Sequence, residues 1–113
     1  MVTVRYSARV GGITELAVTK LDILSGFDEL QVCVGYRLDG RVLERVVPPV
    51  ADLARVEPIY ERLEGWSEPL GDARRFDDLP AAAQAYIRFI EDQVGLPVSI
   101  ITVGPGRDQA VNR

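Results

Sequence analysis

The stretch from residue 77 to residue 104 reads DDLPAAAQAYIRFIEDQVGLPVSIITVG, and it decides the fold class. Between Pro80 and Val94 its apolar residues recur at steps of three and four, which predicts a helix with one apolar face. Asp77 or Asp78 is expected to cap the start of this helix, and Gly95 to end it. Residues 97–103 are rich in β-branched side chains and predict a short buried strand. A helix followed by a buried strand is typical of an α/β sheet.

Three segments outside this stretch also predict structure. Residues 2–10 alternate strictly between apolar and polar, which by itself indicates a strand. Residues 16–24 are apolar on both faces until Lys20 and Asp22, as expected of a strand buried in a sheet. In extended backbone these two side chains would point to the same side. Residues 109–113 are expected to form a loose tail.

The middle of the chain predicts an antiparallel arm. Residues 31–38 and 41–47 alternate as strands do, and Asp39-Gly40 between them is a two-residue hairpin signal. Pro48-Pro49 is expected to end the second strand and begin a loop, after which residues 56–63 are extended again. The predicted fold class is therefore α/β, a mixed α+β arrangement. It combines buried strands of a mostly parallel sheet, an antiparallel hairpin arm and one well-marked amphipathic helix.

Composition indicates which binding partners and which cellular compartment to expect. The chain has 113 residues, enough for one domain, of which 47% are hydrophobic and 27% charged. Its formal net charge of -4 argues against a nucleic-acid backbone or an anionic membrane as partner. The single Cys excludes an internal disulfide framework. No apolar stretch approaches the ~20 residues that span a bilayer, and no signal-peptide pattern begins the chain. We therefore expect a cytoplasmic protein without nucleic-acid or membrane partners.

The spacing of Lys20 and Asp22 suits the recognition of guanine. An ionised Asp accepts both the ring N1–H and the exocyclic amino group of guanine, a pair of donors that adenine does not present. Lys20 is the only lysine, and its stem would lie along the purine face. A second loop, Thr102-Val103-Gly104, ends the last predicted strand, and Gly104 would let the backbone approach a planar ring. The alternative is a solvated Lys/Asp pair at a strand end.

Short motifs follow one another along nearly the whole chain. They are Leu16–Leu24 with Gly26, Val32-Cys33-Val34-Gly35-Tyr36, Val56-Glu57-Pro58-Ile59-Tyr60-Glu61, Gly65-Trp66-Ser67-Glu68, Phe76-Asp77-Asp78-Leu79-Pro80, Ala85-Tyr86-Ile87 and the run from Gly95 to Pro105. In this order they resemble the adenylosuccinate synthetases, a family of purine-biosynthetic ligases. The resemblance implies that residues 1–113 are a single C-terminal portion, without the N-terminal phosphate-loop, IMP and catalytic parts. It also implies that residues 2–10 form a helix, which we adopt over the strand.

The resemblance implies a GTP-dependent ligase that joins IMP and L-aspartate to give adenylosuccinate in AMP biosynthesis. The positions that match the family's guanine-binding residues are Lys20, Leu21, Asp22, Thr102, Val103 and Gly104. GTP would be the co-substrate and the complete enzyme a cytoplasmic homodimer. Mg2+, IMP and L-aspartate would be bound through residues upstream of this chain. No residue here is expected to be catalytic or to ligate metal, because the chain has neither a His nor a Gly-x-x-x-x-Gly-Lys phosphate loop.

Departures from the family pattern leave other functions open. The family's loop often reads Ser-Thr-Gly-Pro-Asp-Arg, whereas residues 102–107 read Thr-Val-Gly-Pro-Gly-Arg, so the resemblance implies backbone rather than side-chain contacts there. Thr19-Lys20-Leu21-Asp22 also resembles the Asn-Lys-x-Asp of small GTPases, but a Thr hydroxyl is a poorer tether between loops than an Asn amide. A non-catalytic guanine-nucleotide-binding module is one alternative. An inactive truncated fragment, whose strand edges pair with another chain, is the other. We expect these residues alone to be inactive.

Overall fold

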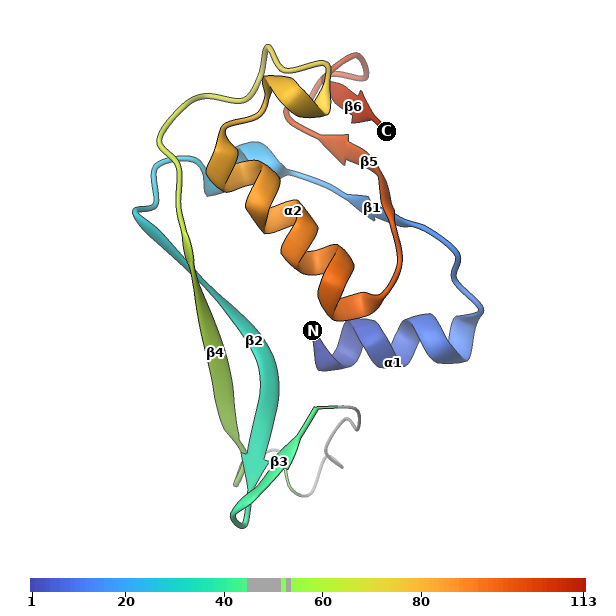
Figure 1. Cartoon of the computed structure of the whole chain (residues 1–113), viewed down its shortest axis with the longest axis vertical. Helices are drawn as coiled ribbons and strands as arrows, with labels where there is room; N and C mark the ends of the chain where they lie inside the picture. Colours follow the sequence, from blue (N-terminus) through green and yellow to red (C-terminus); the bar gives the residue numbers. More distant parts are fainter. Residues whose placement is uncertain (45–51, 53) are drawn as a thin grey trace.

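The fold consists of a small helix-covered sheet and a long three-stranded arm (Figure 1). A computed structural model of the chain describes residues 1–44, 52 and 54–113. In chain order the elements are α1 (Val2–Gly11), β1 (Leu16–Val18), η1 (Leu21–Leu24), β2 (Glu29–Leu38), β3 (Arg41–Leu43), β4 (Glu57–Glu64), η3 (Phe76–Asp78), α2 (Ala81–Val94), β5 (Val98–Thr102) and β6 (Ala110–Asn112), η marking a 3-10 helix. The Cα radius of gyration is 15.5 Å, above the roughly 13 Å of a compact chain this long, because the arm projects outward.

The small sheet has the strand order β1-β5-β6 and is mixed. β1 pairs with β5 in parallel, and β6 pairs with the other side of β5 in antiparallel orientation. Val98 and Ile101 of β5 and Ile87 of α2 are buried in one hydrophobic core, as the predicted apolar faces require. The mixed α/β fold class is confirmed.

The arm consists of β2 with β3 and β4 on its two sides, both antiparallel. Asp39 and Gly40 both have positive φ, 52° and 81°, as a two-residue turn between twisted strands requires. This confirms the predicted hairpin. Residues 45–47 of the second predicted strand and the Pro48-Pro49 break lie outside the described residues.

The main helix, α2, is confirmed, but its predicted cap is wrong. α2 follows Pro80 without a side-chain cap and ends at Gly95, as predicted. The carboxylate of Asp78 instead accepts hydrogen bonds from the backbone N–H groups of Arg74, at 3.2 Å, and Arg75, at 3.0 Å. The intervening 3-10 helix η3 places Asp78 over these earlier N–H groups, so its carboxylate caps η3 and not α2.

The first helix, α1, confirms what the family resemblance implies for residues 2–10. Its strict alternation is misleading, because Val2 is buried while Val4 and Val10 are exposed. α1 spans 10 residues and α2 spans 14. Within the described residues, no helix combines the length and the hydropathy needed to cross a membrane.

Trp66 anchors the loop between the arm and η3. Its side chain is buried, its ring centre lies 6.0 Å from that of Tyr86 in α2, and its indole N–H donates to the Ser25 hydroxyl at 3.0 Å. Burial raises the pKa of Tyr86 above its ordinary value. Trp66 therefore holds η1 against α2, because its ring packs in the core while its polar atom reaches a partner.

The end of the chain is ordered, so the predicted loose tail is wrong. β6 extends the small sheet, and Val111 is fully buried. The Arg113 N–H donates to the Ser99 carbonyl at 2.9 Å, and the Arg113 guanidinium lies 4.1 Å from the centre of the Phe76 ring. The guanidinium also pairs with Glu91 at 2.9 Å. A strand of three residues is too short for its alternation to stand out in the sequence, and pairing with β5 stabilises it.

The carboxyl group of Glu91 makes stability depend on pH. Partial burial raises its pKa, but the N–H of Val98 and the guanidinium of Arg113, each at 2.9 Å, together outweigh burial and hold the pKa below its ordinary value of 4.5. This stabilisation is present above pH 4.5 and is lost as the pH falls through the lower folded pKa. We expect Glu91→Gln to lower the free energy of unfolding near pH 7 by about 1–2 kcal/mol.

Urea titrations near neutral pH and below pH 4.5 measure this effect. Glu91→Gln should flatten the acid-induced loss of stability. Asp92→Asn is the matched control, because Asp92 is an exposed neighbour in the same helix, and it should leave the free energy of unfolding near pH 7 close to that of the wild type. Identical pH dependence in Glu91→Gln and the wild type would contradict the assignment.

Candidate functional site

The structure brings the two loops predicted to read guanine together. The backbone N–H of Lys20 donates to the hydroxyl of Thr102 at 2.9 Å, across 82 residues of sequence. Lys20 follows β1, and Thr102 ends β5. These two strands are parallel neighbours, so their carboxyl ends meet at one edge of the sheet. This edge is where open α/β sheets bind ligands.

The first strand ends earlier than predicted, two residues before Lys20. β1 is Leu16–Val18, whereas the sequence predicted a strand through residue 24. Lys20 has the left-handed conformation, with φ 59° and ψ 37°, and the 3-10 helix η1 follows it directly. The side chain of Leu21 is buried, which turns the chain into the core. The expectation that Lys20 and Asp22 lie on one side of an extended strand is therefore wrong.

The predicted site residues differ in what they offer a ligand. Leu21 and Val103 have side chains that are 1% and 0% exposed, so neither side chain faces a ligand. The Val103 N–H is also engaged, donating to the Gln109 carbonyl at 2.8 Å. Asp22 is half-buried and Lys20 exposed, and in the described part of the chain neither charged group forms a hydrogen bond or an ion pair. The acceptor and the ammonium are thus available.

Thr102 acts within the protein as the tether between the loops. We expect Thr102→Val, which keeps the shape but removes the acceptor for the Lys20 N–H, to lower the free energy of unfolding by about 1 kcal/mol. Thr102→Ser retains the hydroxyl and should remain closer to the wild type. Urea unfolding monitored by circular dichroism compares the variants, and equal stability of Val and Ser at this position would contradict the tether.

Sequence reasoning missed Gln109, which closes the second loop. Its side-chain oxygen accepts from the Gly106 N–H at 2.9 Å, and its side-chain nitrogen donates to the Gly71 carbonyl at 3.3 Å. A methyl group on Gly104 would collide with this carboxamide. Gln109 was placed in the loose tail. The available signal was the pair of glycines at 104 and 106, which leave room for a covering side chain.

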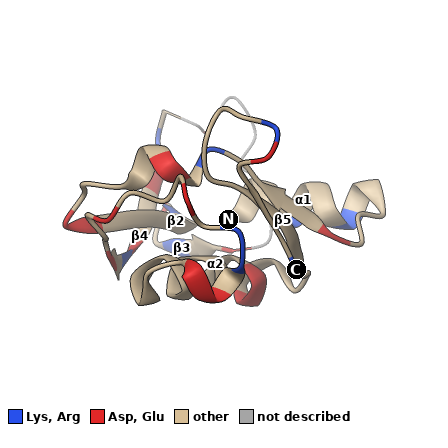
Figure 2. Cartoon of the chain, turned by 90° about the horizontal axis from the view of Figure 1, so that it is seen from above, with Lys and Arg blue, Asp and Glu red and all other residues tan. Residues whose placement is uncertain are grey.

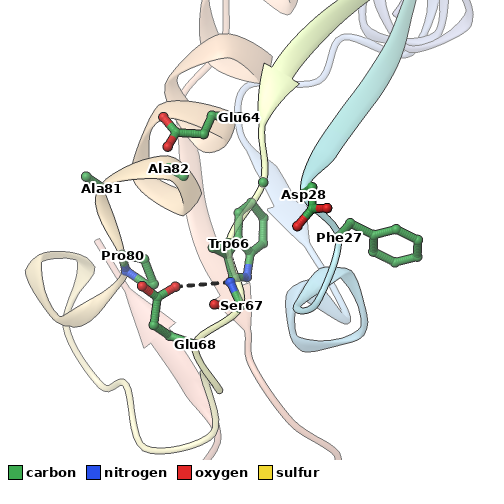
Figure 3. Close-up of a pocket in the computed structure, with 10 residues that line it drawn as sticks. Phe27, Asp28, Glu64, Trp66, Ser67, Glu68, Pro80, Ala81 and Ala82 are labelled. Atoms are coloured by element: carbon green, nitrogen blue, oxygen red, sulfur yellow. Dashed lines mark hydrogen bonds between the residues drawn. The ribbon is translucent and has the colours of Figure 1, made fainter.

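A cavity of about 450 Å³ lies elsewhere, between the base of the arm and the start of α2 (Figure 3). Its lining residues are Phe27, Asp28, Glu64, Gly65, Trp66, Ser67, Glu68, Pro80, Ala81 and Ala82. None of the six predicted guanine-binding residues lines it. The carboxylates of Asp28, Glu64 and Glu68 border the cavity, and the backbone N–H of Ser67 donates to Glu68 at 3.2 Å.

The described part of the chain shows neither a basic strip nor a metal site. Figure 2 shows the basic positions dispersed along the ribbon and not gathered in one strip. Within residues 1–44, 52 and 54–113, no group of three His, Cys, Asp or Glu side chains is arranged to hold a metal ion.

Comparison with known proteins identifies the family. The family profile described as adenylosuccinate synthetase matches residues 1–111. The chain belongs to the adenylosuccinate synthetase family. The adenylosuccinate synthetase of Acidothermus cellulolyticus is 50% identical over 111 residues, which cover 97% of this chain and 26% of the relative. Adenylosuccinate synthetase 1, chloroplastic, of Ricinus communis is 48% identical over 107 residues, covering 95% and 24%.

A solved adenylosuccinate synthetase has the same fold in this region. The structure described as fully ligated adenylosuccinate synthetase from Plasmodium falciparum matches with a TM-score of 0.92 and 34% identity, covering 96% of this chain and 27% of that chain. The chain thus spans about a quarter of the length of its adenylosuccinate synthetase relatives. These shares give the extent of the match and not its place along the relatives, so the C-terminal placement stays a prediction.

Proposed function

We propose that this chain supplies the guanine-recognising part of an adenylosuccinate synthetase, the GTP-dependent ligase that joins IMP and L-aspartate. The observation that carries the proposal is the 2.9 Å hydrogen bond from the Lys20 N–H to the Thr102 hydroxyl. It holds two loops side by side at the carboxyl edge of the sheet, and the carboxylate of Asp22 in one of them is left for a ligand. Membership of the family supports the same reading.

The proposed contacts divide the guanine edge between the two loops. The Asp22 carboxylate accepts from N1–H and from the exocyclic amino group, and the stem of Lys20 lies along the ring face. The Gly104 N–H donates to the guanine carbonyl oxygen. Adenine lacks the N1–H donor, so it would leave the carboxylate unsatisfied, at a cost of about 1–3 kcal/mol or more for a charged group.

The rest of the reaction is assigned to no residue of this chain. Its sequence has no His and no Gly-x-x-x-x-Gly-Lys loop to hold phosphates. Its described residues also do not fit Mg2+, because no three of their His, Cys, Asp or Glu side chains are arranged to hold a metal ion. In the proposed enzyme, the phosphates of GTP, Mg2+, IMP and L-aspartate are bound by other residues. The C-terminal placement of residues 1–113 and a cytoplasmic homodimer belong to this proposal.

A chimera tests the proposal. Residues 1–111 replace the matching segment of the Acidothermus cellulolyticus relative, which is 50% identical. The chimera is assayed with GTP, ITP and ATP as co-substrates. ITP lacks the exocyclic amino group and loses one hydrogen bond to Asp22, so its KM should exceed that of GTP by roughly 10-fold or more. ATP should be poorer still.

Glu68→Gln in the chimera is the control, because Glu68 borders the cavity and none of the proposed contacts involves it. It should leave the preference for GTP unchanged. Equal KM values for GTP and ITP in the chimera would overturn the proposed role of Asp22. Calorimetry on the isolated chain with GTP, GDP and ATP tests the alternative of a free-standing nucleotide-binding module.

A further inference from the structure

Gln109 closes the loop after β5 with its main chain and its side chain. Its carbonyl accepts from the Val103 N–H at 2.8 Å, and its own N–H donates to the Gly106 carbonyl at 3.1 Å. Its side-chain oxygen accepts from the Gly106 N–H at 2.9 Å. Three hydrogen bonds to one residue therefore define the path of the loop.

The same side chain packs over two glycines. A methyl group on Gly104 would collide with the Gln109 carboxamide, and one on Gly106 would lie 3.0 Å from its oxygen. The loop thus lacks side chains where the carboxamide lies. The carboxamide nitrogen donates to the Gly71 carbonyl at 3.3 Å, next to the buried Leu70. The loop is in this way attached to the core.

These contacts decide which backbone donor the loop leaves available. Among residues 103–106, the N–H groups of Val103 and Gly106 are both engaged by Gln109, and Pro105 has no N–H. The Gly104 N–H has no hydrogen-bond partner in the described part of the chain. A single donor therefore remains in this stretch, beside the tether between Lys20 and Thr102.

We infer that Gln109 is a positioning residue for guanine recognition: it shapes the loop after β5 so that the Gly104 N–H alone is presented to the guanine carbonyl oxygen. This inference rests on the proposed function. Gln109 does not touch the base. It acts through the loop, so its loss should affect nucleotide binding more than turnover.

Two substitutions at Gln109 test this in the chimera, at saturating IMP and L-aspartate. Gln109→Met keeps the length and removes both polar atoms. It should raise the KM for GTP about 3- to 10-fold with kcat unchanged. Gln109→Glu keeps an acceptor for the Gly106 N–H and should restore most of the lost affinity. Gln31→Met, at an exposed position in β2, is the matched control and should leave both constants unchanged.

A second pair of variants separates a local effect at Gln109 from a general loss of folding. Gly106→Ala crowds the carboxamide oxygen of Gln109 without removing it, and Gly106 makes none of the proposed contacts with guanine, so this variant should raise the KM for GTP in the wild-type background. It should add little in a Gln109→Ala background, because the two changes disrupt one interaction. Fully additive effects would overturn the inference.

The outcomes separate the two proposals. A raised KM in Asp22→Asn with an unchanged KM in Gln109→Met overturns the inference about Gln109 and leaves the proposed function standing. An unchanged KM in Asp22→Asn overturns the proposed function itself. The positioning role is also overturned if, in Gln109→Met, kcat falls and the KM for IMP rises to the same degree as the KM for GTP.

Discussion

Asp22→Asn is expected to weaken the binding of GTP to the chimera by about 2–4 kcal/mol, or roughly 30- to 1,000-fold in KM. The substitution replaces an ionised acceptor with an amide that presents one acceptor and one donor. The donor would meet the exocyclic amino group of guanine, which is itself a donor. In the described part of the chain the carboxylate has no other partner, so the loss would report on the ligand rather than on a broken internal contact.

The same variant should gain affinity for xanthosine triphosphate. In xanthine a 2-oxo group replaces the 2-amino group, so the new amide donor has an acceptor to meet. Asp28→Asn is the matched control, because Asp28 is an exposed Asp shortly after η1, and it should change neither constant. A GTP KM that stays at the wild-type value in Asp22→Asn would discard the site.

Gly65→Ala is expected to lower the free energy of unfolding by about 3 kcal/mol. Gly65 lies at the base of the arm, where its N–H donates to the Asp28 carbonyl at 2.9 Å. A methyl group on Gly65 would overlap the Phe27 carbonyl oxygen and lie 2.8 Å from the Asp28 carbonyl carbon. Both are backbone atoms, so no side-chain rotation relieves the overlap and the arm must shift.

Thermal and urea unfolding measure this loss, which is a large fraction of the stability of a small domain. Gly11→Ala is the matched control, because a methyl group there would meet only the Ile13 side chain, at 3.5 Å, in ordinary contact. Gly11 lies in α1, so this control should be neutral or slightly stabilising. Equal unfolding midpoints for Gly65→Ala and the wild type would contradict the expected overlap with the backbone of Phe27 and Asp28.

The elements that sequence reasoning predicted well are those whose signals are local. The helix that ends at Gly95 and the turn at Asp39-Gly40 depend on periodicity and turn chemistry within a few residues, and both are confirmed. The misplaced elements depend on distant partners. Asp78 caps η3 because that short helix intervenes, and residues 110–112 form a strand because β5 is available to pair.

The candidate site divides in the same way. Lys20, Asp22 and the glycine of the second loop were predicted as site residues from residue chemistry and the family resemblance. Their arrangement was not, because extended backbone was assumed where Lys20 has φ 59°. Gln109 was missed because its importance lies in contacts with Gly71, Gly104 and Gly106, which no pattern of local spacing reveals.

By itself, the sequence determined the family, the fold class and the residue types that suit guanine, because composition, periodicity and motifs are properties of the chain. Only the tertiary structure decided which atoms remain available to a ligand. Residues 20 and 102 are 82 positions apart, and their hydrogen bond exists because β1 and β5 lie in parallel in one sheet. Hydrogen bonds to Gln109 then engage the backbone N–H groups of Val103 and Gly106 and leave that of Gly104.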